Sequence, residues 1–229
     1  VISQKEISIG ANWKLNNLKD TIKYHEKFVL LDAIEKLTLP LFKKGKVKDI
    51  YNLDNNQLLI MHTDRLSSCN RIVCELEGKG HMLSLLTNYW FSKTNDIISN
   101  HVIKQKDNYL VVEKCKLIPV EFIVRGYITG SMWKKYSQGE RLFCGNNLQD
   151  GLKQYQKLPE FIITPTTKAE VGHDEDISRE EILSQGLVLE EDYILLEKYT
   201  RELFKRGTEL AKDKGLILVD TKYEFGKDA

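Results

Sequence analysis

The sequence predicts an α+β protein, because strand patterns dominate its first half and a mixture of helical and strand patterns follows. Alternating residues around 46–53 and 57–63, on either side of Asp-Asn-Asn, are typical of a β-hairpin. A helical pattern over about 191–213 ends at Gly215, a common C-terminal stop, and a strand follows at once. Strands in front of such a mixture favour two lobes with a cleft between them.

The first half of the chain begins with an amphipathic pattern over 18–37, where apolar residues recur at helical spacing between charged ones. A loop from residue 39 leads into the hairpin. A further helix is predicted over about 80–99. Its expected apolar stripe consists of Leu83, Leu86, Trp90 and Ile97.

The second half contains two strands on either side of Pro119, which lacks an N–H and suits a bend or a sheet edge. Ser131 is predicted as the N-cap of a short helix. A loop region is expected to follow it through about residue 176. The last strand starts with the run LILV at 216–219, which looks buried on both faces.

The composition excludes several classes of protein. The formal net charge of +1 gives no general reason to expect a nucleic-acid or membrane partner, and 41% hydrophobic residues are ordinary for a globular protein. Apolar runs are far too short to span a bilayer. The four cysteines form no CxxC pair, which disfavours a zinc site or a disulfide framework and favours a reduced, cytoplasmic compartment.

The stretch GLILVDTKYEFG places Asp220, Lys222 and Glu224 at alternate positions of the last strand, so the three side chains share one face. A solvated edge strand with alternating charges explains this pattern about as well as a binding site does. Semi-buried carboxylates require a cation or hydrogen-bond donors, however. Oxygen ligands without His or Cys favour Mg²⁺ held together with nucleotide phosphates.

Three further stretches carry candidate anion-binding groups. Gly45 precedes Lys46 and Lys48, which share a strand face and suit a polyphosphate, although a lysine-rich turn is more often plain surface. Arg125, with Ser131 at a helix N-terminus, is a candidate monophosphate site or an ordinary capped helix. The last candidates are Lys168 and Asp174, in a polar loop; none of the five histidines is assigned a catalytic role.

Together these stretches resemble the phosphoribosylaminoimidazole-succinocarboxamide synthase family, also called SAICAR synthetase. The resemblance covers about residues 39–228, in one order and at familiar spacings. The motifs that carry it are GKVKDIY, TDRLSS, GKGHMLSLLTNYWF, KLIPVEFIVRGYITGS, TPTTKAEVGHDED and GLILVDTKYEFG.

The resemblance implies an ATP-dependent carbon–nitrogen ligase that joins 5-aminoimidazole-4-carboxyribonucleotide (CAIR) and L-aspartate. It implies a two-lobed α+β fold related to ATP-grasp and kinase-like nucleotide binders, with ATP in the cleft between the lobes. The expected division is an N-terminal extension over 1–38, a nucleotide-binding lobe over 39–118 and a substrate and Mg²⁺/ATP lobe over 119–229. A homo-oligomer is possible in this family.

The resemblance also implies roles for individual residues. Lys46, Lys48 and Lys168 are expected at the ATP phosphates, and the segment from Cys115 to Leu117 is expected at adenine. Asp220, Lys222 and Glu224 are expected at Mg²⁺ and the triphosphate, with Glu224 and Asp220 as metal ligands and Lys222 and Lys46 stabilising charge. Arg125 and Ser131 are expected at the ribonucleotide phosphate, and Asp64, Arg65 and Asp174 at the carboxylate and aspartate region. No protein nucleophile is expected.

Two departures from the family pattern stand beside this resemblance. Family members continue past the equivalent of Gly226 into a segment with a second acidic metal ligand, so a longer natural chain is expected, with a degenerate copy that has a damaged site as the alternative. Asn70 stands where an acid is usual, which puts the substrate-side loop in doubt. The alternatives are a small-molecule kinase of related fold and a nucleotide-binding module without turnover.

Overall fold

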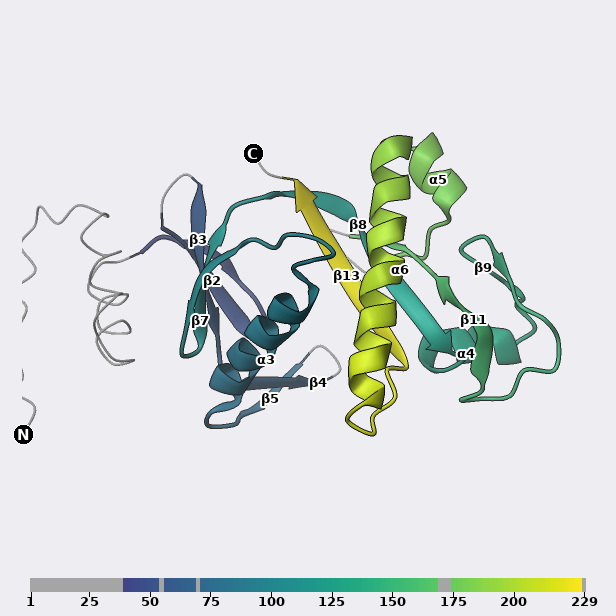
Figure 1. The fold of residues 1–229 in the computed structure, drawn as a ribbon, viewed down its shortest axis with the longest axis horizontal. Helices are drawn as coiled ribbons and strands as arrows, with labels where there is room; N and C mark the ends of the chain where they lie inside the picture. The colour runs from purple at the N-terminus through teal and green to yellow at the C-terminus, as the bar shows by residue number, and fades with distance from the viewer. Residues whose placement is uncertain (1–38, 54–55, 69–70, 169–173, 228–229) are drawn as a thin grey trace, which may run out of the picture. The chain divides into compact units, whose positions relative to one another are not determined.

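The computed structural model describes residues 39–53, 56–68, 71–168 and 174–227, which form two compact units (Figure 1). The first unit holds the described residues up to Ser92 together with His101–Lys114. The second holds Lys93–Asn100 and the described residues from Cys115 onward. The predicted helix over 18–37, most of the hairpin turn and Asn70 lie outside the described residues.

The first unit is built on an antiparallel sheet with the strand order β1-β2-β3-β7-β6. The predicted hairpin is confirmed as β2 and β3, which pair from Lys48 opposite His62 to Asn52 opposite Leu58. The loop predicted from residue 39 contains a strand, β1, because its backbone pairs with β2. The strands are β1 (Leu41–Lys44), β2 (Lys48–Asn52), β3 (Gln57–His62), β6 (Val102–Lys106) and β7 (Tyr109–Glu113).

The core of the first unit lies on the sheet, where Leu59 of β3 is fully buried against Tyr109 and Val111 of β7. The described part of the unit also contains a two-stranded ribbon of β4 (Arg65–Ser68) and β5 (Arg71–Glu75) and the helix α3 (Lys79–Thr94). In its described residues the unit is therefore a five-stranded sheet with one helix and one ribbon.

The helix α3 ends at Thr94, earlier than predicted, and its buried residues are Gly80 and Ser84. The predicted apolar stripe is wrong, because Leu86 and Trp90 are exposed. The helix meets its unit through small residues instead: a Cβ added at Gly80 would lie 2.3 Å from the carbonyl oxygen of His62. Hydrophobic spacing could not reveal a contact made by backbone.

His62 at the end of β3 is 1% exposed, and neither ring nitrogen has a hydrogen-bond partner among the described residues. Burial, with the charges of Lys48 and Lys79, lowers the pKa of His62 to about 4. The folded state therefore holds a neutral imidazole. The unfolded chain binds a proton as the pH falls below the ordinary pKa of 6.5.

The stability supplied by neutral His62 is thus complete above the ordinary pKa and is lost as the pH falls toward the folded-state pKa. We expect the first unit to lose about 2 kcal/mol of unfolding free energy between pH 7.5 and pH 5 from this group. In urea unfolding of the His62→Leu variant, the difference in unfolding free energy between the two pH values should be much smaller than in the parent protein. The matched control is the less buried His81 on α3, since His81→Leu should keep the acid sensitivity. An equal loss in all three proteins would contradict the prediction.

The second unit is organised around the long strand β8, which pairs with β13 along one edge and with β11 and β12 along the other. In Figure 1, β13 runs beside β8 and the helix α6 lies across them. The strands are β8 (Lys116–Tyr127), β9 (Leu142–Phe143), β10 (Asn146–Asn147), β11 (Lys157–Ile163), β12 (Thr166–Thr167) and β13 (Asp220–Lys227). The helices are α4 (Gly130–Ser137), α5 (Arg179–Ser184) and α6 (Glu190–Lys212).

Pro119 lies inside β8, so the strand break predicted at this residue is wrong, and the break falls between β7 and Lys116. The register of β13 against β8 shifts between Glu224, opposite Glu121, and Gly226, opposite Leu117. Pro119 therefore lies where the regular pairing is interrupted, and its missing N–H removes no ladder hydrogen bond there. Its carbonyl oxygen accepts a hydrogen bond from the N–H of Lys168 at 3.1 Å.

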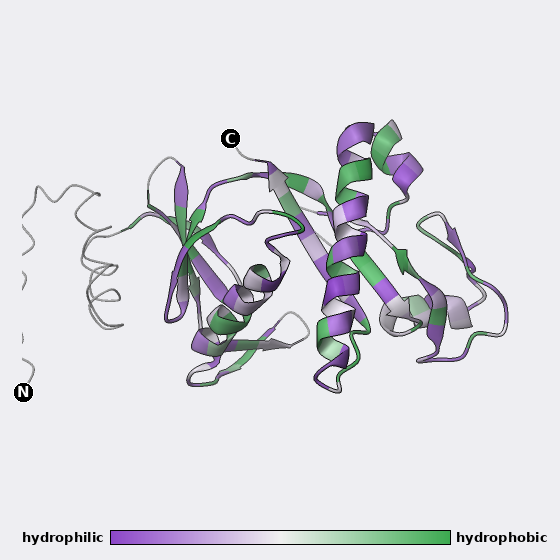
Figure 2. Ribbon diagram, in the orientation of Figure 1, coloured by the Kyte–Doolittle hydropathy of each residue, from purple (hydrophilic) through white to green (hydrophobic). Residues whose placement is uncertain are grey.

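The core of the second unit lies between β8 and α6. Val120, Phe122 and Val124 of β8 are fully buried and pack with Tyr193 and Phe204 of α6. Purple and green alternate along α6 in Figure 2, as expected for an amphipathic helix. The helix predicted over 191–213 is therefore confirmed. Each helix in the described ranges is too short or too polar to traverse a lipid bilayer.

Two predictions for the second unit are wrong. The region predicted as a loop contains β9 to β12, because β11 and β12 pair with β8 through long-range contacts that a local pattern cannot reveal. The run at 216–219 is not buried on both faces: Leu216 and Ile217 are exposed, and β13 begins only at Asp220.

Candidate functional site

The alternation along β13 is confirmed. Asp220, Lys222 and Glu224 are exposed, whereas Tyr223 and Phe225 belong to the core of the second unit. Among the described residues β13 pairs only with β8, and facing residues of an antiparallel pair share one face of the sheet. The charged side chains of β13 therefore lie beside those of β8 on the face opposite the core.

Glu121 of β8 lies directly opposite Glu224. One oxygen of Glu121 accepts a hydrogen bond from Lys222 Nζ at 2.7 Å, and the other lies 3.6 Å from Lys168 Nζ. Lys168 also donates a hydrogen bond to Glu224. We name Glu121, Lys168, Lys222 and Glu224 the carboxylate–lysine cluster; it contains two positive and two negative groups.

Burial makes this cluster costly unless its charges stay paired. Glu121 is 4% exposed, and an unpaired carboxylate at that depth loses its hydration without compensation. Burial raises the pKa of Glu224, but the hydrogen bond and charge of Lys168 outweigh it, so that the pKa lies below its ordinary value. Burial lowers the pKa of Lys222, and the hydrogen bond with Glu121 outweighs that effect and raises it. Both groups are therefore charged at neutral pH.

Asp220 lies away from this cluster, opposite Arg125 in the register. Its carboxylate is 3.8 Å from Arg125, whose Nε also donates a hydrogen bond to Thr164 Oγ1 at 3.0 Å. Asp220 and Glu224 are four residues apart, about 13 Å along a strand, and both side chains stand off the sheet. Since Mg²⁺ binds oxygen at about 2.1 Å, the two carboxylates do not reach one ion. The roles of Asp220 and Glu224 as metal ligands stay predictions, and this spacing excludes only one ion shared by both.

The carboxylates that do face one another are Glu121 and Glu224. In the described part of the chain no group of three or more His, Cys, Asp or Glu side chains gathers to hold a metal. Mg²⁺ is commonly bound by one or two carboxylates, with water and phosphate oxygens completing its shell. The donor set of the cluster fits such an ion held jointly with a nucleotide.

The region of the predicted monophosphate site lies after β8. Arg125 is mostly buried, with 12% of its side chain exposed. The prediction of Ser131 as N-cap is wrong, because the helical backbone of α4 begins before it and Thr129 occupies the cap position without a side-chain hydrogen bond. Ser131 is exposed in the first turn, so its hydroxyl is still at the helix N-terminus.

The segment after the 169–173 gap lies close to both regions. Burial lowers the pKa of Lys222, and Glu121, Glu224 and, last, the charge of Asp174 raise it, so Asp174 acts on the cluster. Asp176 pairs with Lys135 of α4 at 2.6 Å and bridges to Thr166 of β12. This segment therefore ties α4 to the sheet.

The candidates of the first unit lie around the turn between β1 and β2. The Gly45 N–H donates to the carbonyl oxygen of Lys48 at 2.7 Å, which closes a turn that carries Lys46. Asp64 accepts hydrogen bonds from the N–H groups of Gly78 and Gly80 at 3.3 and 2.8 Å and so caps the start of α3. Arg65 makes contacts with the turn itself, described below. The predicted substrate roles of Asp64 and Arg65 stay predictions.

The segment predicted to face adenine consists of Cys115, just before β8, and the first two residues of β8. Leu117 is 48% exposed, and Cys115 is half-buried. Gly226 of β13 packs against this segment, since an added Cβ would lie 2.8 Å from the Cβ of Cys115. The position of the segment thus depends on a glycine in the EFG motif.

Comparison with known proteins decides the family. The family model described as SAICAR synthetase matches residues 41–229 of the chain. The chain belongs to the SAICAR synthetase family. The resemblance stated from the motifs is therefore confirmed.

Relatives within the SAICAR synthetase family include two bacterial proteins named phosphoribosylaminoimidazole-succinocarboxamide synthase. The protein of Bacteroides fragilis is 52% identical over 186 residues, which cover 80% of this chain and 59% of the relative. That of Legionella pneumophila (strain Lens) is 45% identical over 204 residues, covering 86% and 65%. The chain therefore spans about three-fifths of the length of these relatives.

Solved structures of the family share the fold. The SAICAR synthase of Saccharomyces cerevisiae, described as complexed with SAICAR, matches with a TM-score of 0.75 and 36% identity over 83% of this chain and 69% of that one. A SAICAR synthetase in complex with ADP matches with a TM-score of 0.69 and 27% identity, over 81% and 75%. The predicted α+β fold of the SAICAR synthetase type is confirmed.

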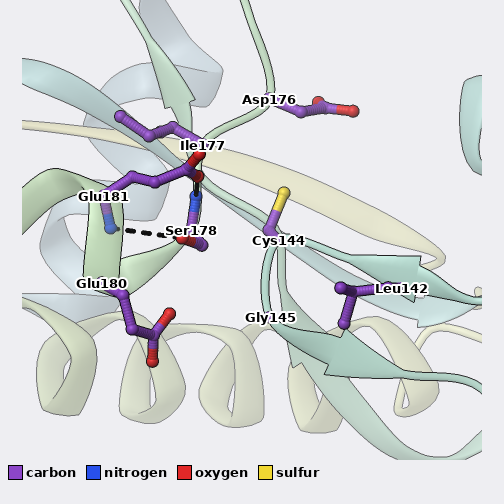
Figure 3. Close-up of a pocket in the computed structure, with 8 residues that line it drawn as sticks. All are labelled: Leu142, Cys144, Gly145, Asp176, Ile177, Ser178, Glu180 and Glu181. Atoms are coloured by element: carbon purple, nitrogen blue, oxygen red, sulfur yellow. Dashed lines mark hydrogen bonds between the residues drawn. The ribbon is translucent and has the colours of Figure 1, made fainter.

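One open pocket of about 400 Å³ in the second unit involves none of the predicted site residues. Figure 3 shows its lining: Leu142, Cys144, Gly145, Asp176, Ile177, Ser178, Glu180 and Glu181. Glu181 and Ser178 form the capping box of α5, as the dashed lines show. Burial raises the pKa of the Cys144 thiol to about 11, so the thiol stays protonated at neutral pH.

Glu121 is the residue of the cluster that the sequence interpretation did not single out. It lies in PVEFIVRG, where apolar residues surround a lone acid in a strand. That isolation was an available signal, since a carboxylate inside an apolar strand requires a partner cation. The partner Lys222 is 101 residues away, and only the pairing of β8 with β13 shows the match.

Proposed function

We propose that the chain carries nucleotide- and substrate-binding parts of an ATP-dependent ligase that joins CAIR and L-aspartate to give SAICAR, ADP and phosphate. Membership of the SAICAR synthetase family supports this proposal, as do the relatives bound to SAICAR and to ADP. The observation that carries it is the carboxylate–lysine cluster, whose facing carboxylates and ammonium groups suit a magnesium-bound polyphosphate.

In this proposal Lys168 and Lys222 contact nucleotide phosphates, and Lys46 and Lys48 are assigned the same role. Glu224 binds Mg²⁺, with Glu121 facing it. The ion, when bound, neutralises charge on the phosphate oxygens. The ammonium groups add further positive charge where negative charge develops during transfer. The backbone from Cys115 to Leu117 contacts adenine.

The chemistry follows from the reactants. A carboxylate resists attack by an amine because its oxygen is a poor leaving group. The carboxylate oxygen of CAIR attacks the terminal phosphorus of ATP and ADP leaves, which gives an acyl phosphate. The amine of aspartate then attacks the acyl carbon, phosphate leaves and the amine loses a proton. The protein positions the reactants and stabilises charge, and it forms no covalent intermediate.

Arg125 and Ser131 bind the ribonucleotide phosphate in this proposal. A guanidinium that is mostly buried and an exposed hydroxyl at the start of α4 are suitable donors for a monophosphate. Asp64 and Asp174 are assigned to the aspartate side. We assign the protein to the cytoplasm, which suits the free thiols of Cys74 and Cys144 among the described residues. A homo-oligomer stays a prediction.

The proposal is tested by measuring ADP release with CAIR and L-aspartate and then omitting each in turn. The chain should be tested both as given and extended to the length of its relatives. ADP release that requires both substrates supports the ligase. Release that needs a phosphate acceptor but not aspartate favours a small-molecule kinase, and ATP binding without turnover in either form favours a nucleotide-binding module.

Replacing Arg125 with alanine is expected to raise the KM for CAIR by about tenfold or more and to leave the KM for ATP within about twofold, because the guanidinium bonds a phosphate of CAIR alone. Steady-state ADP release measures both constants. Arg201→Ala, which removes an exposed guanidinium paired with Glu197 on α6, is the matched control and should change neither. Equal increases in both KM values would remove Arg125 from the phosphate role.

A further inference from the structure

The side chain of Arg65 holds the turn that carries Lys46 and Lys48. Its two terminal nitrogens donate to the two oxygens of Asp49 at 2.9 and 2.7 Å, a bidentate pair. Nη2 also donates to the carbonyl oxygen of Gly45 at 3.0 Å, and Nε donates to that of Lys46 at 3.1 Å. One guanidinium therefore binds both ends of the segment 45–49.

The same turn is held by Thr63, two residues before Arg65. Its backbone N–H and its hydroxyl each donate to the carbonyl oxygen of Val47 at 3.0 Å. The carbonyl groups of three consecutive turn residues are thus bonded to one short segment of the chain. A Cβ added at Gly45 would lie 2.9 Å from the carbonyl oxygen of Lys48, so the turn is closed as tightly as a glycine allows.

The burial of these bonds and their geometry together require an arginine. Arg65 and Asp49 expose only 13% and 10% of their side chains. A planar guanidinium presents five N–H donors in a fixed fork, and four of its hydrogen bonds are made here. A lysine carries the same charge but cannot reach two carboxylate oxygens and two carbonyl oxygens in this arrangement.

We propose that Arg65 is a positioning residue for polyphosphate binding: it fixes the backbone of the turn so that Lys46 and Lys48 are presented together to the phosphates of a nucleotide. The proposal rests on the phosphate role proposed above for these lysines. The family resemblance implies that Arg65 contacts a substrate carboxylate. In this proposal Arg65 instead affects nucleotide binding through the turn. Because the turn is already ordered in the free protein, nucleotide binding carries no further entropy cost for ordering it.

The test compares the binding of MgADP and of adenosine by titration calorimetry. Arg65→Lys is expected to weaken MgADP binding by about tenfold, because the lysines lose their common geometry, and to leave adenosine binding within about twofold. Arg201→Lys, an exposed arginine in an ion pair on α6, is the matched control and should bind both ligands normally. Equal weakening for both ligands, or no weakening for MgADP, would overturn the proposal.

A double-variant cycle separates positioning from general damage. In a Lys46→Ala, Lys48→Ala background Arg65→Lys should weaken MgADP binding by less than about twofold more, since the groups it positions are gone. A full further tenfold loss would overturn the proposal. If Arg65→Lys does not fold, Asp49→Asn, which keeps the two carbonyl contacts of Arg65, takes its place in the same cycle.

The failure of this inference differs from the failure of the proposed function. MgADP binding that depends on Arg65, without ADP release that requires CAIR and aspartate, would leave the inference standing and remove the ligase. Ligase activity together with normal MgADP binding by the Arg65→Lys variant would support the ligase and overturn the inference. Failure of the unaltered protein to bind MgADP would overturn both.

Discussion

Replacing Glu121 with glutamine is expected to lower turnover by about 100-fold or more and the free energy of unfolding by about 1–2 kcal/mol. Glutamine keeps the shape of the side chain but removes the charge that faces Lys222 at 2.7 Å and Lys168 at 3.6 Å. The two ammonium groups would then share Glu224 alone. The stability loss is set below that of a fully buried pair, because 45% of the Lys222 side chain is exposed.

Steady-state ADP release and urea unfolding of the same preparation measure the two effects. Glu197→Gln is the matched control, since Glu197 pairs with Arg201 on the surface of α6, and it should change unfolding by less than about 0.5 kcal/mol. Glu121→Asp retains the charge and should keep the stability better than the turnover. A Glu121→Gln variant with normal turnover would show that the cluster has no part in the reaction.

The largest expected effect on stability comes from Gly80→Ala at the start of α3. The new Cβ would lie 2.3 Å from the carbonyl oxygen of His62 and 2.9 Å from its carbonyl carbon, so backbone must move. That shift also strains the hydrogen bond from the Gly80 N–H to Asp64, now 2.8 Å. We expect the first unit to lose about 3 kcal/mol of unfolding free energy, measured by urea denaturation.

Gly207→Ala on α6 is the matched control for this substitution. Its Cβ would lie 2.9 Å from a terminal methyl group of Leu218, which can rotate away, and alanine favours the helix by about 1 kcal/mol over glycine. We therefore expect Gly207→Ala to be neutral or slightly stabilising. A Gly80→Ala protein as stable as the parent would show that α3 tolerates displacement from β3.

Local patterns predicted the elements whose formation depends on near neighbours. The β2–β3 hairpin follows from alternation on both sides of a short turn, and α6 follows from apolar residues at helical spacing that end before Gly215. The alternation of Asp220, Lys222 and Glu224 follows from strand geometry alone. The family resemblance needed no structure either, because its motifs are collinear and many.

Pairings between distant segments were not predictable in the same way. Strands β11 and β12 have little strand pattern of their own and form because β8 offers its second edge. The buried side of α3 is made by Gly80 and Ser84, small residues that hydrophobic spacing overlooks. The apolar run at 216–219 looked buried, yet Leu216 and Ile217 are exposed in the described part of the chain.

The sequence by itself determined the fold class, the family and the charged face of the last strand, because each follows from patterns among residues close together along the chain. Only the tertiary structure decided which charges meet. It placed Glu121 opposite Glu224 and Asp220 beside Arg125. It also bonded Arg65 to the turn that carries Lys46 and Lys48. Strand register sets the contacts of Glu121 and Asp220, and that register depends on backbone pairing between segments about 100 residues apart, which no local pattern records.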